Sequence, residues 1–405
     1  MLPNEEKSVK KRSLMRLSAE TGAAFLMATS AIGPGFLTQT SRFTEELLTS
    51  FGFVILISLL LDIGAQLNIW RVISITNKRA QDLANGLLPG LGVFLALLIA
   101  LGGFVFNIGN IGGTGLGLNA LTGMDIYLSA CISTFFALGI FWVKNTGKLM
   151  DHLVRILGIL MILFTLYIAF SSAPPLANAL LHTFWPEKTD SLKIVTLVGG
   201  TVGGYISFAG AHRLIDAGIT GKENIRAVTR SAVSGILITS FMRYILFLAV
   251  LGVVMKGLAL DASNPAASVF RHAAGEPGYR FFGFVMWSAA ITSVVGASFT
   301  TISFFRTLHP LLEKHYKILI TLFILCSLGV FLLKGNPVAL LIFAGAVNGL
   351  ILPVALAVIL IASRTKKIRN LYKTPLWLEV AGWLVVFTMS WLGALSIKNN
   401  LAQLF

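Results

Sequence analysis

Long apolar stretches alternate with short polar connections along almost the whole chain. A helix needs about 20 apolar residues to cross the hydrocarbon core of a bilayer, whereas a transmembrane β-strand needs about ten with alternating polarity. The stretches here have helical length and lack the alternation. They predict an all-α integral membrane protein with eleven transmembrane helices, at residues 20–41, 48–71, 86–110, 124–143, 151–172, 193–215, 231–255, 280–305, 317–333, 337–362 and 376–397.

Composition excludes most other classes of protein. Of the 405 residues, 56% are apolar and 12% are charged, and the mean hydropathy is +0.82. Soluble proteins carry about 25% charged residues, so a soluble enzyme, a disordered chain and a nucleic-acid-binding module are excluded. Cys131 and Cys326 lie inside apolar stretches, so neither a disulfide framework nor a cysteine metal site is expected.

The basic residues indicate the orientation of the helices. With the N-terminus placed in the cytoplasm, 23 of the 32 Lys and Arg residues fall in cytoplasmic connections and 8 in external ones. This bias follows the positive-inside rule, so most of the net charge of +15 is an orientation signal. We therefore expect a multi-pass protein of the inner (plasma) membrane, with a cytoplasmic N-terminus and an external C-terminus.

Two of the predicted helices are interrupted near their middle. The first contains Gly33-Pro34-Gly35, and the sixth contains two glycine pairs, at 199–200 and 203–204. Proline and paired glycines weaken a helix, and unwound backbone at membrane depth is tolerated only where it is buried in protein or lines a cavity. Interruptions at equivalent positions of inverted halves point to a transporter binding site. The alternative is that the glycines only allow close helix packing.

The interrupted helices are five spans apart, which predicts two halves of opposite orientation. The first half is residues 19–172 and the second is residues 193–363, joined by an external loop at 173–192. A cytoplasmic tail, residues 1–18, precedes them, and a cytoplasmic loop with the eleventh helix, residues 364–405, follows.

Three short stretches, AIGPGFL, GGTVGGY and NGLILPVAL, resemble the NRAMP (natural resistance-associated macrophage protein) family of divalent-metal transporters in their order and helix positions. The resemblance covers residues 20–362 and implies a LeuT-like fold, a five-plus-five inverted repeat in which helices 1 and 6 are broken. It also implies a secondary transporter that works by alternating access. The spans contain no Ser–His or paired-carboxylate constellation and no polar row along a pore, so neither an enzyme nor a channel is expected.

The positions that bind metal in this family carry no ligand side chain here. The resemblance places them at Gly33, Phe36, Gly203 and Gly345, which offer only backbone carbonyls, whereas divalent cations take carboxylate, imidazole or thiolate ligands. No metal site and no cofactor are expected. Half-helices that begin after the two breaks present free N–H groups, which favour a carboxylate. We expect a small organic solute, a carboxylate or an amino-acid derivative such as 5-oxoproline. The alternative cargo is a divalent cation (Mn, Fe or Mg) coupled to protons.

Polar and small residues around the breaks form the expected substrate site. Arg243 lies in the middle of the seventh helix, and an intramembrane charge is a functional candidate by default. Asp62 of the second helix lies at a depth that lets the two pair, and an ion pair that only fixes helix register is the alternative. The expected substrate-binding residues are Gly33, Pro34, Gly35, Phe36, Gln39, Thr201, Gly203, Gly204, Tyr205, Ser207, Asn107 and Arg243.

A proton path is expected beside the second break. His212 titrates near neutral pH, and Asp216 follows four residues later on the same helix face; with Asp62 they are the expected coupling residues. A solvated polar cluster at the helix end is the alternative. Threonines and serines in spans often bond back to their own helix, and Asn107 and Asn110 are expected first as contacts between helices and second as pocket lining.

The stretch GGTGLGLN at 112–119 has the glycines of a phosphate-binding loop but lacks the Lys-Ser/Thr ending, and it is expected in an external loop. The expected partners are therefore a small-molecule substrate, protons and the lipid bilayer, with no nucleic acid. The oligomeric state stays open.

Overall fold

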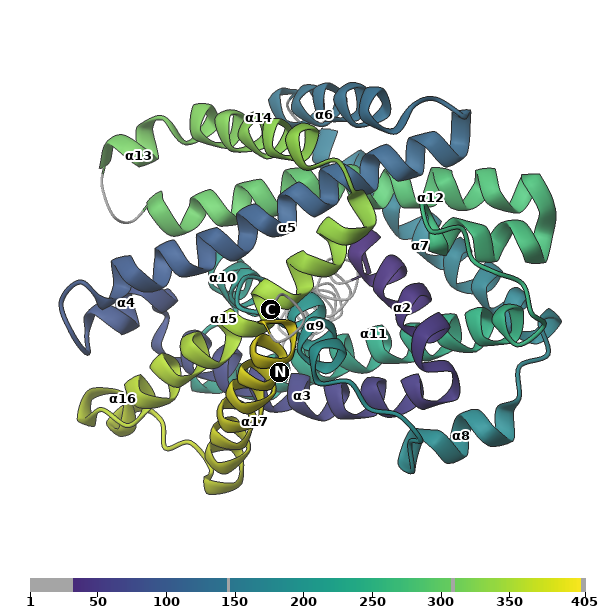
Figure 1. The fold of residues 1–405 in the computed structure, drawn as a ribbon. Helices are drawn as coiled ribbons and strands as arrows, with labels where there is room; N and C mark the ends of the chain where they lie inside the picture. Colours follow the sequence, from purple (N-terminus) through teal and green to yellow (C-terminus); the bar gives the residue numbers. More distant parts are fainter. Residues whose placement is uncertain (1–31, 144–145, 307–309, 402–405) are drawn as a thin grey trace, which may run out of the picture.

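The computed structural model describes residues 32–143, 146–306 and 310–401, and over these ranges the chain is helical and contains no strand (Figure 1). Two short 3₁₀ helices, η1 (Leu48–Ser50) and η2 (Lys222–Asn224), precede α3 and α11. The predicted N-terminal tail and the first helix up to residue 31 lie outside the described residues. The α-helices are α2 (Pro34–Leu47), α3 (Phe51–Thr76), α4 (Ala80–Asn85), α5 (Leu91–Thr122), α6 (Ile126–Trp142), α7 (Thr146–Ser171), α8 (Leu176–Phe184), α9 (Ser191–Thr201), α10 (Ile206–Asp216), α11 (Ile225–Val254), α12 (Pro265–Arg306), α13 (Pro310–Lys314), α14 (Tyr316–Lys334), α15 (Pro337–Ser363), α16 (Lys366–Leu371) and α17 (Leu376–Leu401).

The predicted spans from the second to the eleventh coincide with helices among the described residues, with α9 and α10 forming one broken span, and residues 34–41 of the first lie in α2. By length and hydropathy, eight helical stretches there can cross a membrane, or nine with the bent pair Gly158–Ser171 and Leu176–Phe184. The number of membrane-crossing stretches is lower than the predicted eleven for three reasons. The stretch Pro34–Thr76 holds two predicted segments, and α6 has only 17 residues. The fifth predicted segment belongs to the bent pair. α12 begins well before the predicted segment and is kinked at residues 274–275.

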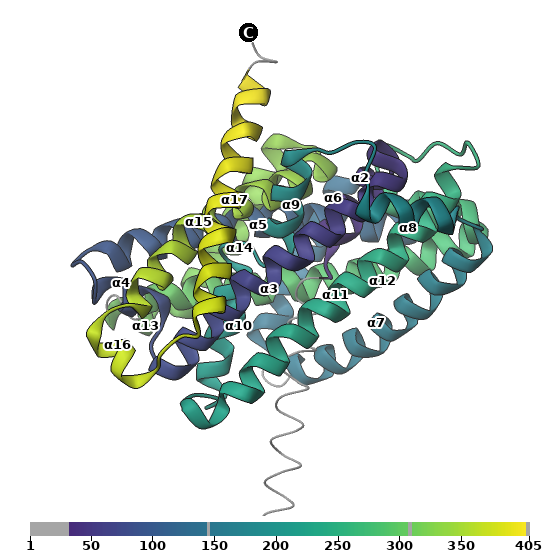
Figure 2. The same cartoon turned by 90° about the horizontal axis from the view of Figure 1, so that it is seen from below.

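Short helices outside the spans gather at two opposite ends of the molecule. α4 and α16 lie together at one end, and α8 lies at the other, in both views of the fold (Figures 1 and 2). The sequence places α4 and α16 in cytoplasmic connections and α8 in the external loop. The arrangement is therefore compatible with the predicted orientation.

The stretch GGTGLGLN is helical, which contradicts its prediction as an external loop: α5 continues to Thr122. The glycines let neighbouring elements approach the α5 backbone closely. A Cβ at Gly112 would lie 2.9 Å from Pro337 of α15, and one at Gly117 would lie 2.5 Å from the backbone of Trp287 in α12. Tertiary packing here outweighs the low helix propensity of glycine.

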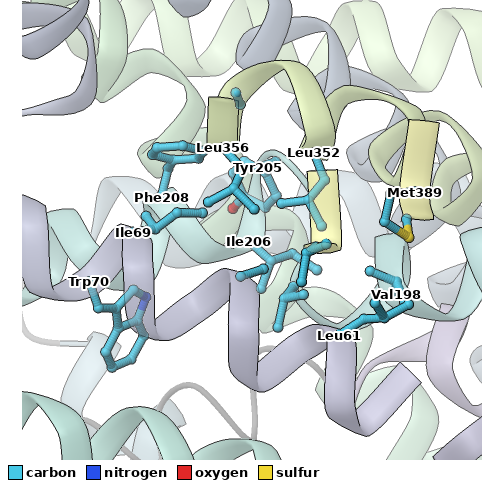
Figure 3. Close-up of a cluster of buried hydrophobic side chains, with 14 of the residues drawn as sticks. Leu61, Ile69, Trp70, Val198, Tyr205, Ile206, Phe208, Leu352, Leu356 and Met389 are labelled. Atoms are coloured by element: carbon cyan, nitrogen blue, oxygen red, sulfur yellow. The ribbon is translucent and has the colours of Figure 1, made fainter. Parts of the chain in front are cut away.

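A hydrophobic core surrounds the second break. Side chains of α3, α10, α15 and α17 interlock there, including Leu61, Phe208, Leu352 and Met389 (Figure 3). Trp70 of α3, only 1% exposed, adds a polar contact, because its indole N–H donates to the backbone carbonyl of Ser207 at 2.9 Å. The break thus lies among apolar side chains and also accepts a directed hydrogen bond from Trp70.

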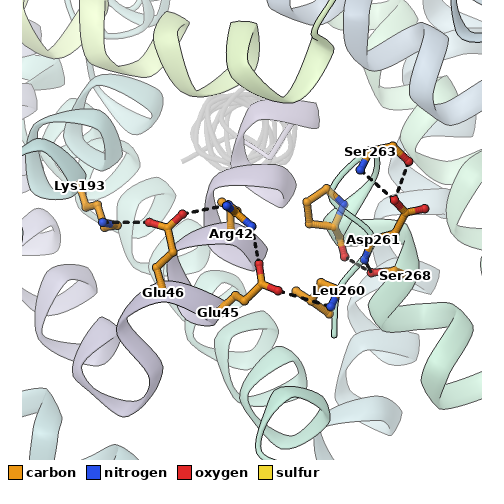
Figure 4. Close-up of polar contacts among 9 residues, drawn as sticks. Arg42, Glu45, Glu46, Lys193, Leu260, Asp261, Ser263 and Ser268 are labelled. Carbon is orange, nitrogen blue, oxygen red and sulfur yellow. Dashed lines mark hydrogen bonds and ion pairs between the residues drawn. The ribbon is translucent and has the colours of Figure 1, made fainter. Parts of the chain in front are cut away.

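A polar network joins the C-terminal end of α2 to the start of α9 (Figure 4). Arg42 pairs with Glu45 at 2.7 Å and with Glu46 at 2.9 Å, and Glu46 pairs with Lys193 of α9 at 3.0 Å. Glu45 also accepts a hydrogen bond from the Leu260 amide in the α11–α12 connection. Three separate segments therefore meet at this end of the two half-helices.

Candidate substrate site at the two helix breaks

The predicted first break lies at Gly33, where the backbone is extended (φ −116°, ψ −171°) and α2 begins at Pro34; the residues before 32 lie outside the described part of the chain. Proline suits the first position of a helix because its missing N–H has no partner there and its φ is already helical. The ring of Pro34 rests on Gly113 of α5, where a Cβ would come within 2.3 Å of it. A Cβ at Gly33 would lie 3.5 Å from the Ser293 hydroxyl of α12. α5 and α12 therefore fix where α2 starts.

Phe36 and Arg243 meet at the first turn of α2. The guanidinium carbon of Arg243, from α11, lies 4.3 Å from the centre of the Phe36 ring in a cation–π contact. Each residue is 2% exposed, and none of the three guanidinium nitrogens has a hydrogen-bond partner among the described residues. Because buried polar groups are nearly always bonded and an unpaired buried charge is costly, this guanidinium is a strong candidate for contact with a ligand.

Asp62 is the charged neighbour of Arg243. It lies on α3, which packs against α11, and it is close enough to Arg243 to interact electrostatically. Asp62 is 1% exposed, and its Oδ1 atom has no hydrogen-bond partner among the described residues. No direct ion pair joins the two within this part of the chain. The charges are neighbours without forming the closed pair that the register explanation requires.

The side chain of Gln39, on α2, lies between α9 and α15. Its Nε2 donates to the Leu341 carbonyl of α15 at 3.1 Å. A Cβ at Gly345 would lie 2.5 Å from that Nε2, and a Cβ at Gly200 of α9 would lie 2.7 Å from the Oε1. Glycine at both positions makes room for the side chain. Gly345, where the resemblance places a metal-binding position, thus lies against the carboxamide of Gln39 from α2.

The second break separates α9 from α10, as predicted, and Asn348 of α15 holds it. The Asn348 Oδ1 accepts a hydrogen bond from the Tyr205 amide at 3.2 Å, and its backbone carbonyl accepts one from the Gly204 amide at 3.1 Å. Its Nδ2 donates to the Gly102 carbonyl of α5 at 2.9 Å. One asparagine therefore supplies partners that the unwound backbone lacks.

Polar side chains at this break bond mostly to the protein itself. The Ser207 hydroxyl donates to the Val202 carbonyl at 2.8 Å and so spans the break. The Thr201 hydroxyl bonds back to its own helix. The Tyr205 ring packs against Phe106 of α5, with ring centres 5.7 Å apart. These contacts favour a structural role for Thr201 and a bridging role for Ser207.

The glycines of the second break also serve close packing. A Cβ at Gly199 would lie 1.9 Å from the Gly345 carbonyl, and a Cβ at Gly349 would lie 2.2 Å from the Val195 carbonyl. α9 and α15 therefore touch through their backbones, as small residues allow in membranes. Gly203 is equally confined, because a Cβ there would lie 2.2 Å from the Gly199 carbonyl.

The two breaks differ in which backbone amides remain available. The Gly204 and Tyr205 amides are bonded to Asn348, so the prediction of free N–H groups at the second break is wrong there. At the first break, the amides of Gly35 and Phe36 belong to the opening turn of α2 and have no partner among the described residues. A helix N-terminus carries partial positive charge. Together with Arg243, it makes the first break suited to an anion.

The predicted coupling pair near the second break is not formed. His212 accepts a hydrogen bond on Nε2 from the Ala80 amide at 3.3 Å, and its ring lies 4.5 Å from that of Phe304. Asp216 instead accepts from Arg79 at 3.1 Å. An imidazole nitrogen that accepts a hydrogen bond carries no proton, so His212 is neutral in this arrangement. Both residues tie α10 to the α4 segment.

Asn107 points away from the two breaks. It donates to the Ser327 hydroxyl of α14 at 3.1 Å, so it joins two helices as its alternative role predicted.

The sequence singled out neither Asn348 nor Gly113 as a site residue, although Asn348 lies in the stretch NGLILPVAL and inside a Gly345–Gly349 spacing typical of close helix contacts. The described residues hold no group of three or more His, Cys, Asp or Glu side chains able to bind a metal ion.

Comparisons with known proteins agree on family and fold. The sequence model of the Natural resistance-associated macrophage protein-like (Nramp) family matches residues 24–398. YcsG, an uncharacterized membrane protein of Bacillus subtilis (strain 168), is 57% identical over 384 residues, covering 95% of each chain. An uncharacterized membrane protein of Haemophilus influenzae is 53% identical over 390 residues, covering 96% of this chain and 98% of that one.

Solved structures share the fold at low identity. A mutant of the Eremococcus coleocola manganese transporter has a TM-score of 0.65 at 16% identity, covering 96% of this chain and 88% of that one. MhsT in complex with L-phenylalanine has a TM-score of 0.59 at 18% identity, covering 95% and 98%. Mhp1, a nucleobase-cation-symport-1 family transporter, has a TM-score of 0.55 at 16% identity, covering 93% and 91%. These neighbours share the LeuT-like fold predicted from the sequence, and the match over residues 24–398 shows that the chain belongs to the Nramp family.

Proposed function

We propose that this secondary transporter carries a small organic anion, a carboxylate or an amino-acid derivative that bears one. The cargo is held at the first break, with its carboxylate between the Arg243 guanidinium and the opening turn of α2. Arginine suits this role because its planar fork binds carboxylates with two parallel hydrogen bonds. The Phe36 ring, against which the guanidinium already lies, offers an apolar wall to the rest of the solute.

One observation carries this proposal: the Arg243 guanidinium is buried and all of its nitrogens lack a partner among the described residues. An anion at this point supplies the missing acceptors. A divalent cation would be repelled, since it adds positive charge beside a guanidinium and a positive helix end. The glycines at positions 33, 203 and 345 add no oxygen or sulfur ligand from a side chain.

A divalent metal ion is the second candidate cargo. Family membership favours it, because the solved relatives include manganese transporters of Eremococcus coleocola. Backbone carbonyls at the breaks and the carboxylate of Asp62 are the oxygen ligands that this alternative would use.

Ligand-dependent thermal stability of the purified protein tests the two candidates, because a ligand that binds only the folded state raises its apparent stability. We expect lactate or 5-oxoproline to raise the unfolding temperature and Mn²⁺ to leave it unchanged. Arg243→Gln should abolish the shift, whereas Arg280→Gln, at an exposed position of α12, should keep it. Stabilisation by Mn²⁺ alone, with equal responses of both variants, would refute the anion proposal.

A further inference from the structure

We propose that Asp62 binds the proton that accompanies the anion, so that one proton crosses the membrane with each negative charge carried at Arg243. The inference rests on the proposed function, because it requires an anion at Arg243. It adds what that function leaves open, namely the coupling ion and the number of coupling ions per cargo molecule.

The first step is the charge of the empty site. Asp62 and Arg243 are both buried, and together they carry no net charge when Asp62 is ionised. The Oδ1 of Asp62 and all three guanidinium nitrogens of Arg243 lack a hydrogen-bond partner among the described residues. Because no closed ion pair joins the two side chains there, each keeps hydrogen-bonding capacity for a partner of its own. An anion binds to Arg243 and a proton binds to Asp62.

The second step is the charge of the loaded site. An anion on Arg243 leaves the carboxylate of Asp62 uncompensated, and a buried uncompensated charge is strongly disfavoured. Proton uptake by Asp62 restores neutrality. The empty and the loaded sites then both carry zero net charge, so both can pass through the low-dielectric interior during the transport cycle. Transport is consequently electroneutral for a monocarboxylate.

Asp62 differs in position from most of the other charged groups on the elements that pack against α3. Elements packed against α3 carry other charged or titratable groups, but these belong mostly to helix ends. The exception is Tyr244, in the middle of α11, whose hydroxyl is bonded to Thr183 of α8. Arg243 is the charge that acts on Asp62 among the described residues. The remaining groups are Arg71 on α3 itself, Arg42, Glu45 and Glu46 on α2, His182 on α8, Lys193 on α9, His212, Arg213 and Asp216 on α10, Arg226 and Arg230 on α11, Lys366, Lys367 and Arg369 on α16, and Glu379 and Lys398 on α17.

Uptake of labelled lactate and 5-oxoproline into liposomes containing the full chain tests the proposal. With the outside one pH unit more acidic, one proton per anion permits about tenfold accumulation, because one pH unit is 1.36 kcal/mol. An imposed potassium diffusion potential should not change the uptake rate. Asp62→Asn should keep exchange of internal for external anion within about threefold and lose proton-driven accumulation, since its empty site retains the Arg243 charge.

Asp82→Asn, an exposed aspartate on α4, is the matched control and should accumulate anion like the wild type. Accumulation by Asp62→Asn equal to that of the wild type, or loss of exchange in a folded Asp62→Asn protein, would overturn the coupling role. If Asp62→Asn does not fold, wild-type uptake that responds to membrane potential overturns it instead. Wild-type protein that transports neither anion contradicts the proposed function, whereas anion transport without a pH effect contradicts only the coupling.

Discussion

Substitution of Asn348 by Ala should loosen the second break without removing any residue from it. The change deletes the Oδ1 that accepts from the Tyr205 amide and the Nδ2 that donates to the Gly102 carbonyl. The bond from the Gly204 amide to the backbone carbonyl at 348 remains, because alanine keeps that carbonyl. The Nδ2 also donates to the Ala344 carbonyl at 3.0 Å. Because the Gly102 and Ala344 carbonyls lie inside α5 and α15 and keep their helical bonds, the Tyr205 amide is the group that loses its partner.

The expected magnitude follows from that amide. Leaving a buried donor without a partner costs about 1–3 kcal/mol. The lower bound already corresponds to an increase of about fivefold in the equilibrium constant for opening, since 1.4 kcal/mol is a factor of ten. We expect the effect to concentrate at residues 202–207 rather than to spread over the spans.

Amide hydrogen exchange of the purified protein measures this directly, because exchange of a protected amide reports the free energy of local opening. Peptides that cover residues 202–207 should exchange at least about fivefold faster in Asn348→Ala, because 1.4 kcal/mol is a factor of ten. Asn110→Ala is the matched control. It removes the same atoms from an asparagine that is 1% exposed and whose Nδ2 has no hydrogen-bond partner among the described residues. Equal exchange of these peptides in the two variants would show that Asn348 does not hold the break.

Two further substitutions test how the breaks are supported. Gly113→Ala places a Cβ 2.3 Å from the Pro34 ring and should destabilise the protein by about 1–3 kcal/mol, whereas Gly139→Ala, which meets nothing within 4 Å, should leave the unfolding temperature unchanged or higher. Ser207→Ala removes the hydroxyl that spans the second break and should cost about 0.5–1.5 kcal/mol, with faster exchange there. Thr201→Val, which loses only a bond within its own helix, should show no such acceleration; identical behaviour of the two would argue against a bridging role.

The spans and the second break were predictable because they depend on local composition. Hydropathy alone locates a membrane helix, and the glycine pairs at 199–200 and 203–204 are weak helix formers wherever they occur. The same reasoning fails at 112–119. That stretch is as glycine-rich as a loop. It is nevertheless helical, because α2, α12 and α15 pack closely against its backbone where glycine has no side chain. Propensity cannot reveal such contacts between distant segments.

Side-chain partners were harder to predict than helices. His212 and Asp216 are correctly spaced for one helix face, yet each finds a partner on the α4 segment, which the sequence does not place beside α10. Counting the helical rise per residue placed Arg243 and Asp62 at similar depths in the membrane. Equal depth predicts that the two side chains are neighbours, but it does not predict whether they touch. Asn348 lacked any local signal for its role, since its partners lie on two other helices.

The contacts between α2 and α9 constrain how a passage can form beside them. Glu46 and Lys193 connect the two half-helices at one end, and Gln39 lies against Gly200 nearer the break. These two contacts favour movement of α2 and α9 together over tilting of either one alone. The contact between Pro34 and Gly113 of α5 opposes such a movement, and we expect it to resist more strongly than the partly exposed charges do.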